Sequence, residues 1–166
     1  MSRPGADSAM TAAPDASRRA RVEHLGREVA GEVSPPGAVD FALSARGGLG
    51  AWSWPDGRIR VSRALVDLLD DDELRAALAH EVGHLLDGGH VVGGPASLRG
   101  SHGAAGVEAR ADVLGCRLLR ARGAPTEALP RMLRRLAASL GAGADGPDPA
   151  LLLRRAAAAE GACAAA

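Results

Sequence analysis

The chain has 166 residues, with 20 basic and 20 acidic side chains and no net charge. A nucleic-acid-binding protein usually shows a basic excess, so we expect no nucleic-acid partner. No run approaches the roughly 20 apolar residues that cross a bilayer, and the N-terminus has no apolar stretch typical of a secretion signal, so we expect no membrane span.

The N-terminal part predicts a tail followed by a helix. Residues 1–17 are rich in Ala, Ser, Pro and Asp, which indicates a disordered tail. From residue 17 onward, Val22, Leu25 and Val29 recur at helical spacing, and the SPPG sequence at residues 34–37 ends the helix. We expect one domain over residues 18–160 and a short tail over 161–166.

Three strands are predicted next, at residues 38–44, 49–54 and 58–62, because apolar and polar residues alternate there. The tight-turn sequence Pro55-Asp56-Gly57 predicts that the last two strands form a hairpin. These segments indicate a small, mainly antiparallel sheet.

The remainder is predicted to be helical, at residues 64–69, 72–87, 104–122, 126–140 and 149–160, with a glycine-rich segment at 88–106. Asp70 and Glu73 have the spacing of a capping box, and Gly88 is suited to end the helix that follows. The fold class predicted is α+β and mainly helical.

The sequence LAHEVGH at residues 78–84 carries the clearest chemistry. At 100° per residue, His80 and His84 lie about 40° apart on a helix, and they point away from its apolar stripe. Two imidazoles one turn apart can bind one zinc ion, and Glu81 lies beside that ion, where it can act as a general base. The alternative is a pair of ordinary surface histidines.

A catalytic zinc needs a third protein ligand, and the sequence VEARADVLGCRLL (107–119) offers Glu108. Asp112, one turn later, could hydrogen-bond a ligand histidine and fix its orientation, or it could be a solvated surface charge. His90, His102 and Asp87 are competing donors.

Cys116 and Cys163 are the two cysteines, and the absence of a CxxC pair excludes a cysteine-based zinc knuckle. A disulfide between them is possible but has no support in the sequence. This usage fits a reduced cytoplasm best, so we expect a cytoplasmic protein.

The sequence WPDGRIRVSRALVDLLDDDELRAALAHEVGHLLDGGH, followed by EARAD, resembles the M48 peptidases, gluzincins that include HtpX-like, Ste24-like and Oma1-like proteases. The resemblance implies a zincin-like fold in which the sheet packs against the HExxH helix. It implies that His80, His84 and Glu108 bind one Zn²⁺, that Glu81 is the general base and that Asp112 supports the site. It also implies an unfolded or extended polypeptide substrate, which adds as a strand to an edge of the sheet. The 49–54 strand is the candidate edge.

The chain departs from the family pattern near its C-terminus. The family often ends with H-P-x-x-x-x-R, whose His and Arg face the active site, and the matching stretch here is DPALLLR. Arg154 is retained and is expected to act in catalysis. Asp148 replaces the histidine, and a carboxylate cannot donate a hydrogen bond to a developing oxyanion unless it is protonated. Asp148-Pro149 could equally be the start of a helix.

The leading hypothesis is a soluble zinc metalloendopeptidase. An ImmA-like protease that cleaves a regulatory protein is an alternative, since such proteins also carry HExxH and a later E-x-x-A. A zinc-stabilised interaction module with little turnover is another, and Asp148 is its main support. The sequence gives no oligomeric state.

Overall fold

The computed structural model describes residues 7–31, 38–88, 96–97, 105–140 and 148–165. The candidate ligands His90 and His102 lie outside these residues. In chain order the elements are α1 (Asp7–Ala30), β1 (Asp40–Ser44), β2 (Ala51–Ser53), β3 (Arg58–Ser62), α2 (Arg63–Leu68), α3 (Asp71–Asp87), β4 (Ala96–Ser97), α4 (Ala105–Ala121), α5 (Ala128–Ser139) and α6 (Pro149–Ala165). The α+β class with a mainly helical composition is confirmed.

The four strands form one sheet in the order β1-β3-β2-β4. β2 and β3 are antiparallel and form the predicted hairpin, in which Trp54 N donates to Arg58 O over 2.9 Å. Gly57 has a φ of 89°, which explains glycine at this turn. β1, however, pairs with β3 in parallel, so the sheet is mixed. Antiparallel pairing is confirmed for β2 with β3 and with β4, and it is wrong for β1. The alternation of residues along a strand shows which side chains share a face. It does not show whether the neighbouring strand is parallel or antiparallel.

The prediction that residues 49–54 form an edge strand is also wrong. The two-residue strand β4 pairs with β2, with Trp52 opposite Ser97, so β2 lies inside the sheet. Within the described residues the edges are β1 and β4. Two residues inside a glycine-rich segment are too short to give an alternating pattern, and the sequence therefore could not reveal this strand.

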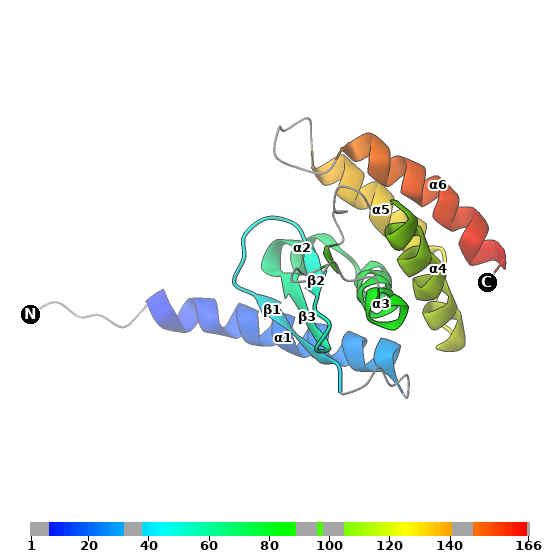
Figure 1. Cartoon of the computed structure of the whole chain (residues 1–166). Coiled ribbons are helices and arrows are strands. Elements are labelled where there is room, and N and C mark those ends of the chain that lie inside the picture. Colours follow the sequence, from blue (N-terminus) through cyan, green and yellow to red (C-terminus); the bar gives the residue numbers. More distant parts are fainter. Residues whose placement is uncertain (1–6, 32–37, 89–95, 98–104, 141–147, 166) are drawn as a thin grey trace, which may run out of the picture.

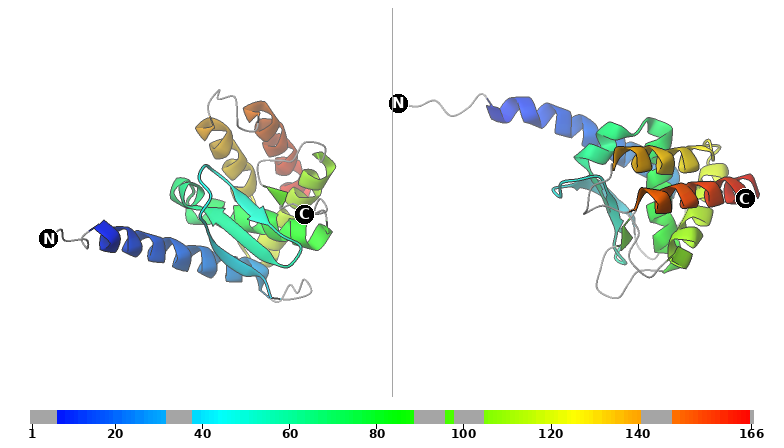
Figure 2. Two further views of the ribbon diagram at one scale, coloured as in Figure 1. Left: turned by 60° about the vertical axis from the view of Figure 1, so that its left-hand side comes forward. Right: turned by 90° about the horizontal axis from the view of Figure 1, so that it is seen from above.

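Helix α3 lies between the sheet and the group formed by α4, α5 and α6, as Figures 1 and 2 show. The predicted capping box is present at its start, because Glu73 N donates to Asp70 Oδ1 over 2.8 Å and Asp70 N donates to Glu73 Oε2 over 3.2 Å. Gly88 ends the helix at a φ of 63°. Both predicted ends of this helix are confirmed.

The middle of α3 is buried on every side, because the sheet covers one face and α4 another. Leu74, Leu78 and Val82 form the predicted apolar stripe and are fully buried. His80 and His84 are fully buried as well, although their face was expected to be exposed. The spacing of apolar residues identifies one buried face of a helix. It does not reveal a second buried face when the helix lies between two other elements.

Two helices are longer than the sequence predicts. α1 begins at Asp7, so residues 7–16 are helical although they were expected to be disordered. α6 continues to Ala165, through most of the predicted C-terminal tail. The boundaries of the single domain at 18 and 160 stay a prediction.

Cys116 on α4 and Cys163 on α6 form a disulfide with a Cα–Cα distance of 5.1 Å. Both side chains are buried. A disulfide is uncommon in reducing compartments, so cysteine usage no longer supports the cytoplasmic expectation. Across the described residues, no helix combines the length and apolar character needed to cross a bilayer.

Candidate metal centre

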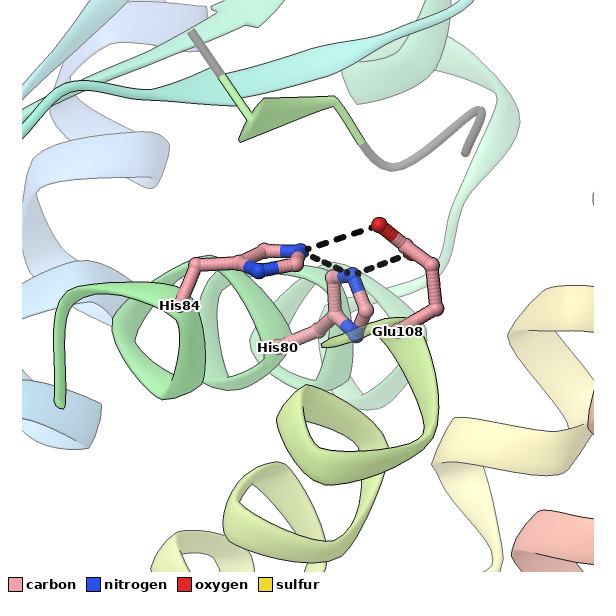
Figure 3. A group of neighbouring side chains, drawn as sticks. All are labelled: His80, His84 and Glu108. Carbon is pink, nitrogen blue, oxygen red and sulfur yellow. Dashed lines mark hydrogen bonds and ion pairs between the residues drawn. The ribbon is translucent and has the colours of Figure 1, made fainter. Parts of the chain in front are cut away.

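The centre of the candidate site is the histidine pair on α3. His80 and His84 project from the same side of the helix, one turn apart, and their Nε2 atoms lie 3.0 Å from each other (Figure 3). Neither side chain is accessible to solvent. Because the predicted spacing is a property of the helix itself, the sequence was sufficient to bring these two rings together.

Glu108, in the first turn of α4, supplies a carboxylate to the same point. Its Oε2 lies 3.3 Å from His80 Nε2, and its Oε1 lies 3.5 Å from His84 Nε2 (Figure 3). Among the described residues, His80, His84 and Glu108 are the group whose ligand atoms all lie within 4.8 Å of one another. Asp87, a competing donor, instead accepts from Arg110 Nε over 2.9 Å.

The spacing of these donors fits a tetrahedral zinc ion. Ligands held about 2.0–2.1 Å from such an ion lie roughly 3.3 Å from each other. The observed separations of 3.0, 3.3 and 3.5 Å bracket that value. Two imidazoles and one carboxylate also form the ligand type of a catalytic zinc site, which leaves one coordination position for water or substrate.

Asp112 lies one turn after Glu108 on α4 and faces His80. His80 Nδ1 lies 2.8 Å from Asp112 Oδ1, so the ring can donate its Nδ1 proton there and direct Nε2 towards Glu108. Burial lowers the pKa of His80, but the adjacent Asp112 carboxylate has the opposite effect, and the pKa of His80 is raised to about 9. The alternative of a solvated surface charge at Asp112 is wrong, since its exposure is 3%.

Glu81 follows His80 on α3 and is fully buried. Burial raises the pKa of Glu81 to about 7, against the opposing effect of the His80 ring. A carboxyl group with this pKa can both accept and release a proton near neutral pH, as a general base that later acts as an acid must do.

Arg154 lies away from the site, so the expectation that it faces the active site is wrong. Its side chain is 68% exposed and its Nη2 lies 3.9 Å from Asp148. The arginine at the site is the next residue, Arg155, which contacts both Glu108 and Asp112.

Asp148 occupies the start of α6. Its Oδ1 accepts a hydrogen bond from Ala150 N over 2.9 Å, and Pro149 is the first residue of the helix. This is the alternative that the sequence left open, a helix N-cap followed by proline. The side chain of Asp148 is 62% exposed.

Arg155 is a site residue that was not predicted from the sequence. A signal for it was present, because Leu152, Ala156 and Ala159 repeat at helical spacing and are all buried. Position 155 lies on the same face of the helix. The pair Arg154-Arg155 thus has one exposed member and one buried member.

Comparisons with known proteins agree with this geometry over part of the chain. Residues 16–97 match the model of peptidase family M48. Over this segment the chain is similar to peptidase family M48. The matched segment includes His80, Glu81 and His84. Glu108, Asp112 and Arg155 lie beyond it. Their assignment to the site therefore rests on the geometry.

Among curated relatives, Protease HtpX of Pseudomonas fluorescens (strain Pf0-1) is 39% identical over 67 residues, which is 40% of this chain and 22% of the relative. Protease HtpX of Stutzerimonas stutzeri (strain A1501) is also 39% identical over 67 residues, or 40% of this chain and 23% of the relative. The chain thus spans under a quarter of the length of these relatives. No solved structure matches the chain.

Proposed function

We propose that this protein is a zinc-dependent metalloendopeptidase with a gluzincin-like site. The observation that carries the proposal is the group of donors from His80, His84 and Glu108. The two Nε2 atoms lie 3.0 Å apart, and each has one Glu108 oxygen at 3.3 or 3.5 Å, which suits one tetrahedral zinc ion. The M48 match over residues 16–97 supports a peptidase, and it favours this function over an ImmA-like protease. Zincin-like packing of the sheet on α3 is part of the same proposal.

In this proposal each buried residue has a separate task. Zinc at the site would supply Lewis-acid chemistry that makes water nucleophilic at neutral pH. Glu81 takes the proton of the attacking water and then passes it to the leaving amine, for which its pKa of about 7 is suited. Asp112 holds the Nδ1 side of His80 and so keeps Nε2 available for binding.

The substrate proposed is an unfolded or extended polypeptide. An extended chain can add to an exposed strand through backbone hydrogen bonds. β4 is the described edge strand that contacts α3, the helix of the histidine pair, and it takes the place of the 49–54 strand as the candidate edge. The relatives named Protease HtpX support a polypeptide substrate.

A zinc-stabilised module with little turnover is the second candidate. The observation in its favour is that Asp148 is turned to solvent as a helix cap and that Arg154 is exposed. Neither residue that the family pattern offers for oxyanion stabilisation lies at the site. Zinc binding without cleavage is the outcome that this candidate expects.

The test compares wild type, Glu81→Gln and Glu108→Ala, with Glu23→Gln as a control because its side chain is 47% exposed. Bound zinc is measured by elemental analysis after dialysis, and cleavage is followed on an unfolded protein such as casein. We expect Glu81→Gln to retain zinc and to lose roughly 100-fold or more of the cleavage rate, since it lacks the general base. Glu108→Ala should lose both zinc and cleavage.

The outcomes separate the candidates. Cleavage by Glu81→Gln at the wild-type rate would contradict the mechanism. Zinc bound by wild type with no cleavage would favour the module. Full zinc affinity in Glu108→Ala would remove Glu108 from the ligand set and make His90 the leading candidate for the third ligand.

A further inference from the structure

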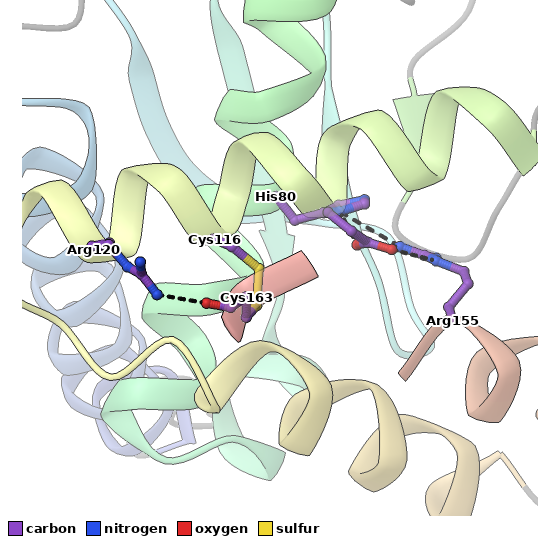
Figure 4. The surroundings of a disulfide bond; sticks show 6 residues. His80, Cys116, Arg120, Arg155 and Cys163 are labelled. Atoms are coloured by element: carbon purple, nitrogen blue, oxygen red, sulfur yellow. Dashed lines mark hydrogen bonds and ion pairs between the residues drawn. A yellow bond between two sulfur atoms is a disulfide. The ribbon is translucent and has the colours of Figure 1, made fainter. Parts of the chain in front are cut away.

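Arg155 is a buried cation among buried carboxylates. It extends from α6 towards α4 and His80 (Figure 4), with 9% of its surface exposed. Its Nη1 lies 3.0 Å from Glu108 Oε2, while its Nη2 and Nε donate to Asp112 over 2.8 and 3.1 Å. One guanidinium therefore joins the proposed zinc ligand to the residue that orients His80.

We propose that Arg155 is a positioning residue, which holds Glu108 and Asp112 in the geometry that binds the metal. This inference rests on the proposed function, because it concerns the same site. Arg155 acts through the two carboxylates rather than on substrate. Nothing in the M48 match covers it, since the matched residues end at 97.

The electrostatic reason is the burial of two like charges one turn apart. Glu108 and Asp112 have exposures of 4% and 3%, and two carboxylates in such surroundings repel one another and lack hydration. A guanidinium satisfies both, because its planar fork offers several N–H groups in fixed directions. Lysine would bring the charge without the fork.

Helix α6 is held in place at a second point, so the position of Arg155 does not depend on its own ion pairs alone. The Cys116–Cys163 disulfide joins α4 to α6, and Arg120 Nη2 donates to Cys163 O over 2.7 Å (Figure 4). Cys163 lies eight residues after Arg155, or about 12 Å along the helix. Two attachments this far apart restrain both the rotation and the sliding of α6 against α4.

The chain offers a matched control in Arg154. It has the same side chain on the same helix, and it is 68% exposed with its Nη2 3.9 Å from Asp148. Replacing it alters the charge of the protein and the composition of α6 by the same amount as replacing Arg155. The two arginines differ in their burial and in the contacts that Arg155 makes with Glu108, Asp112 and His80.

The test measures the zinc affinity of the full chain for wild type, Arg155→Met and Arg154→Met, by competition with a chromophoric chelator. Residues that support metal ligands typically contribute 10–100-fold to affinity, and we expect a loss of about that size in Arg155→Met. Arg154→Met should stay within about 2-fold of wild type, since an exposed charge contributes little. The absorption spectrum of the Co²⁺-substituted protein should change only in Arg155→Met, because it reports the arrangement of the ligands.

Arg155→Lys provides the test if Arg155→Met fails to fold by circular dichroism. It keeps the charge and loses the planar fork of the guanidinium, so its zinc affinity should be at least about 3-fold below that of wild type. Unchanged zinc affinity in the folded Arg155 variant would overturn the inference, even if the variant were less stable. A wild-type protein that binds no zinc would instead overturn the proposed function itself.

Discussion

Glu81 is an ionisable carboxyl group whose side chain is completely buried. Its ionised form loses hydration there, and its pKa rises to about 7 from an ordinary value of 4.5. Burial therefore brings the pKa of the proposed base close to neutral pH, and it lowers the stability of the folded protein. This loss of stability can be measured in the metal-free protein.

We predict that Glu81→Gln is more stable than wild type above pH 7 when both are metal-free. The folded pKa of Glu81, about 7, exceeds the unfolded value of 4.5, so the folded state binds the proton more tightly. The contribution of Glu81 to stability is thus present below pH 4.5 and is lost as the pH rises to about 7. Above that pH the difference in free energy of unfolding should reach the order of 3 kcal/mol.

Urea unfolding in the presence of a chelator, followed by tryptophan fluorescence at several pH values, measures this difference. Glu23→Gln serves as the control, because its side chain is 47% exposed and its difference from wild type should stay small at all pH values. A difference for Glu81→Gln that does not change between pH 4.5 and 7 would contradict the explanation.

At the scale of elements, the contact between α3 and α4 brings Glu108 to the histidines. Gly83 lies at this contact, where an added Cβ would be 2.7 Å from Ala111 O and 3.2 Å from Ala111 Cα. Only a residue without a side chain allows the two backbones to approach so closely. The glycine inside HEVGH therefore helps to bring the third donor within 3.5 Å of the rings.

We predict that Gly83→Ala destabilises the protein by about 1–3 kcal/mol, because the added methyl group overpacks the contact. Helix propensity alone predicts the opposite, a gain of about 1 kcal/mol. The zinc affinity should fall as well, since α4 carries Glu108. Thermal unfolding and chelator competition measure the two effects.

Gly161→Ala is the matched control on α6, because an added Cβ there meets nothing within 4 Å. It should raise stability by about 0.5–1 kcal/mol through helix propensity and leave zinc affinity unchanged. If both alanine variants were equally stabilising, the contact between α3 and α4 would not be close.

At the scale of the whole molecule, the site is assembled from distant parts of the chain. α3 lies in the segment that matches family M48, while α4 and α6 come after it. The Cys116–Cys163 disulfide joins these last two helices across 47 residues, and α5 lies within the loop that it closes. The bond should therefore restrict the unfolded chain substantially.

We predict that reduction of this disulfide lowers the free energy of unfolding by about 4 kcal/mol, the loop-closure value for 47 residues. Urea unfolding with and without a phosphine reductant measures the loss. Cys163→Ser should match the reduced protein and should not respond to the reductant. Two free thiols in the native protein, with unfolding unchanged by the reductant, would contradict the pairing.

The sequence by itself determined the features that depend on local geometry. The histidine pair follows from helical spacing, the capping box from Asp70 and Glu73, and the hairpin from its turn residues. Glu108 was one of several donors that the sequence offered, and its ligand atoms lie in one group with those of the two histidines. Each of these depends on residues near one another in the chain or on the chemistry of one side chain.

The tertiary structure alone decided the burial of the site, the order of the strands and the choice between Arg154 and Arg155. Burial of His80 and His84 depends on what covers α3, and the parallel pairing of β1 depends on β3 lying beside it. Arg154 and Arg155 have the same chemistry but point about 100° apart on their helix. Only the packing of α6 on α4 determines which of the two meets the carboxylates.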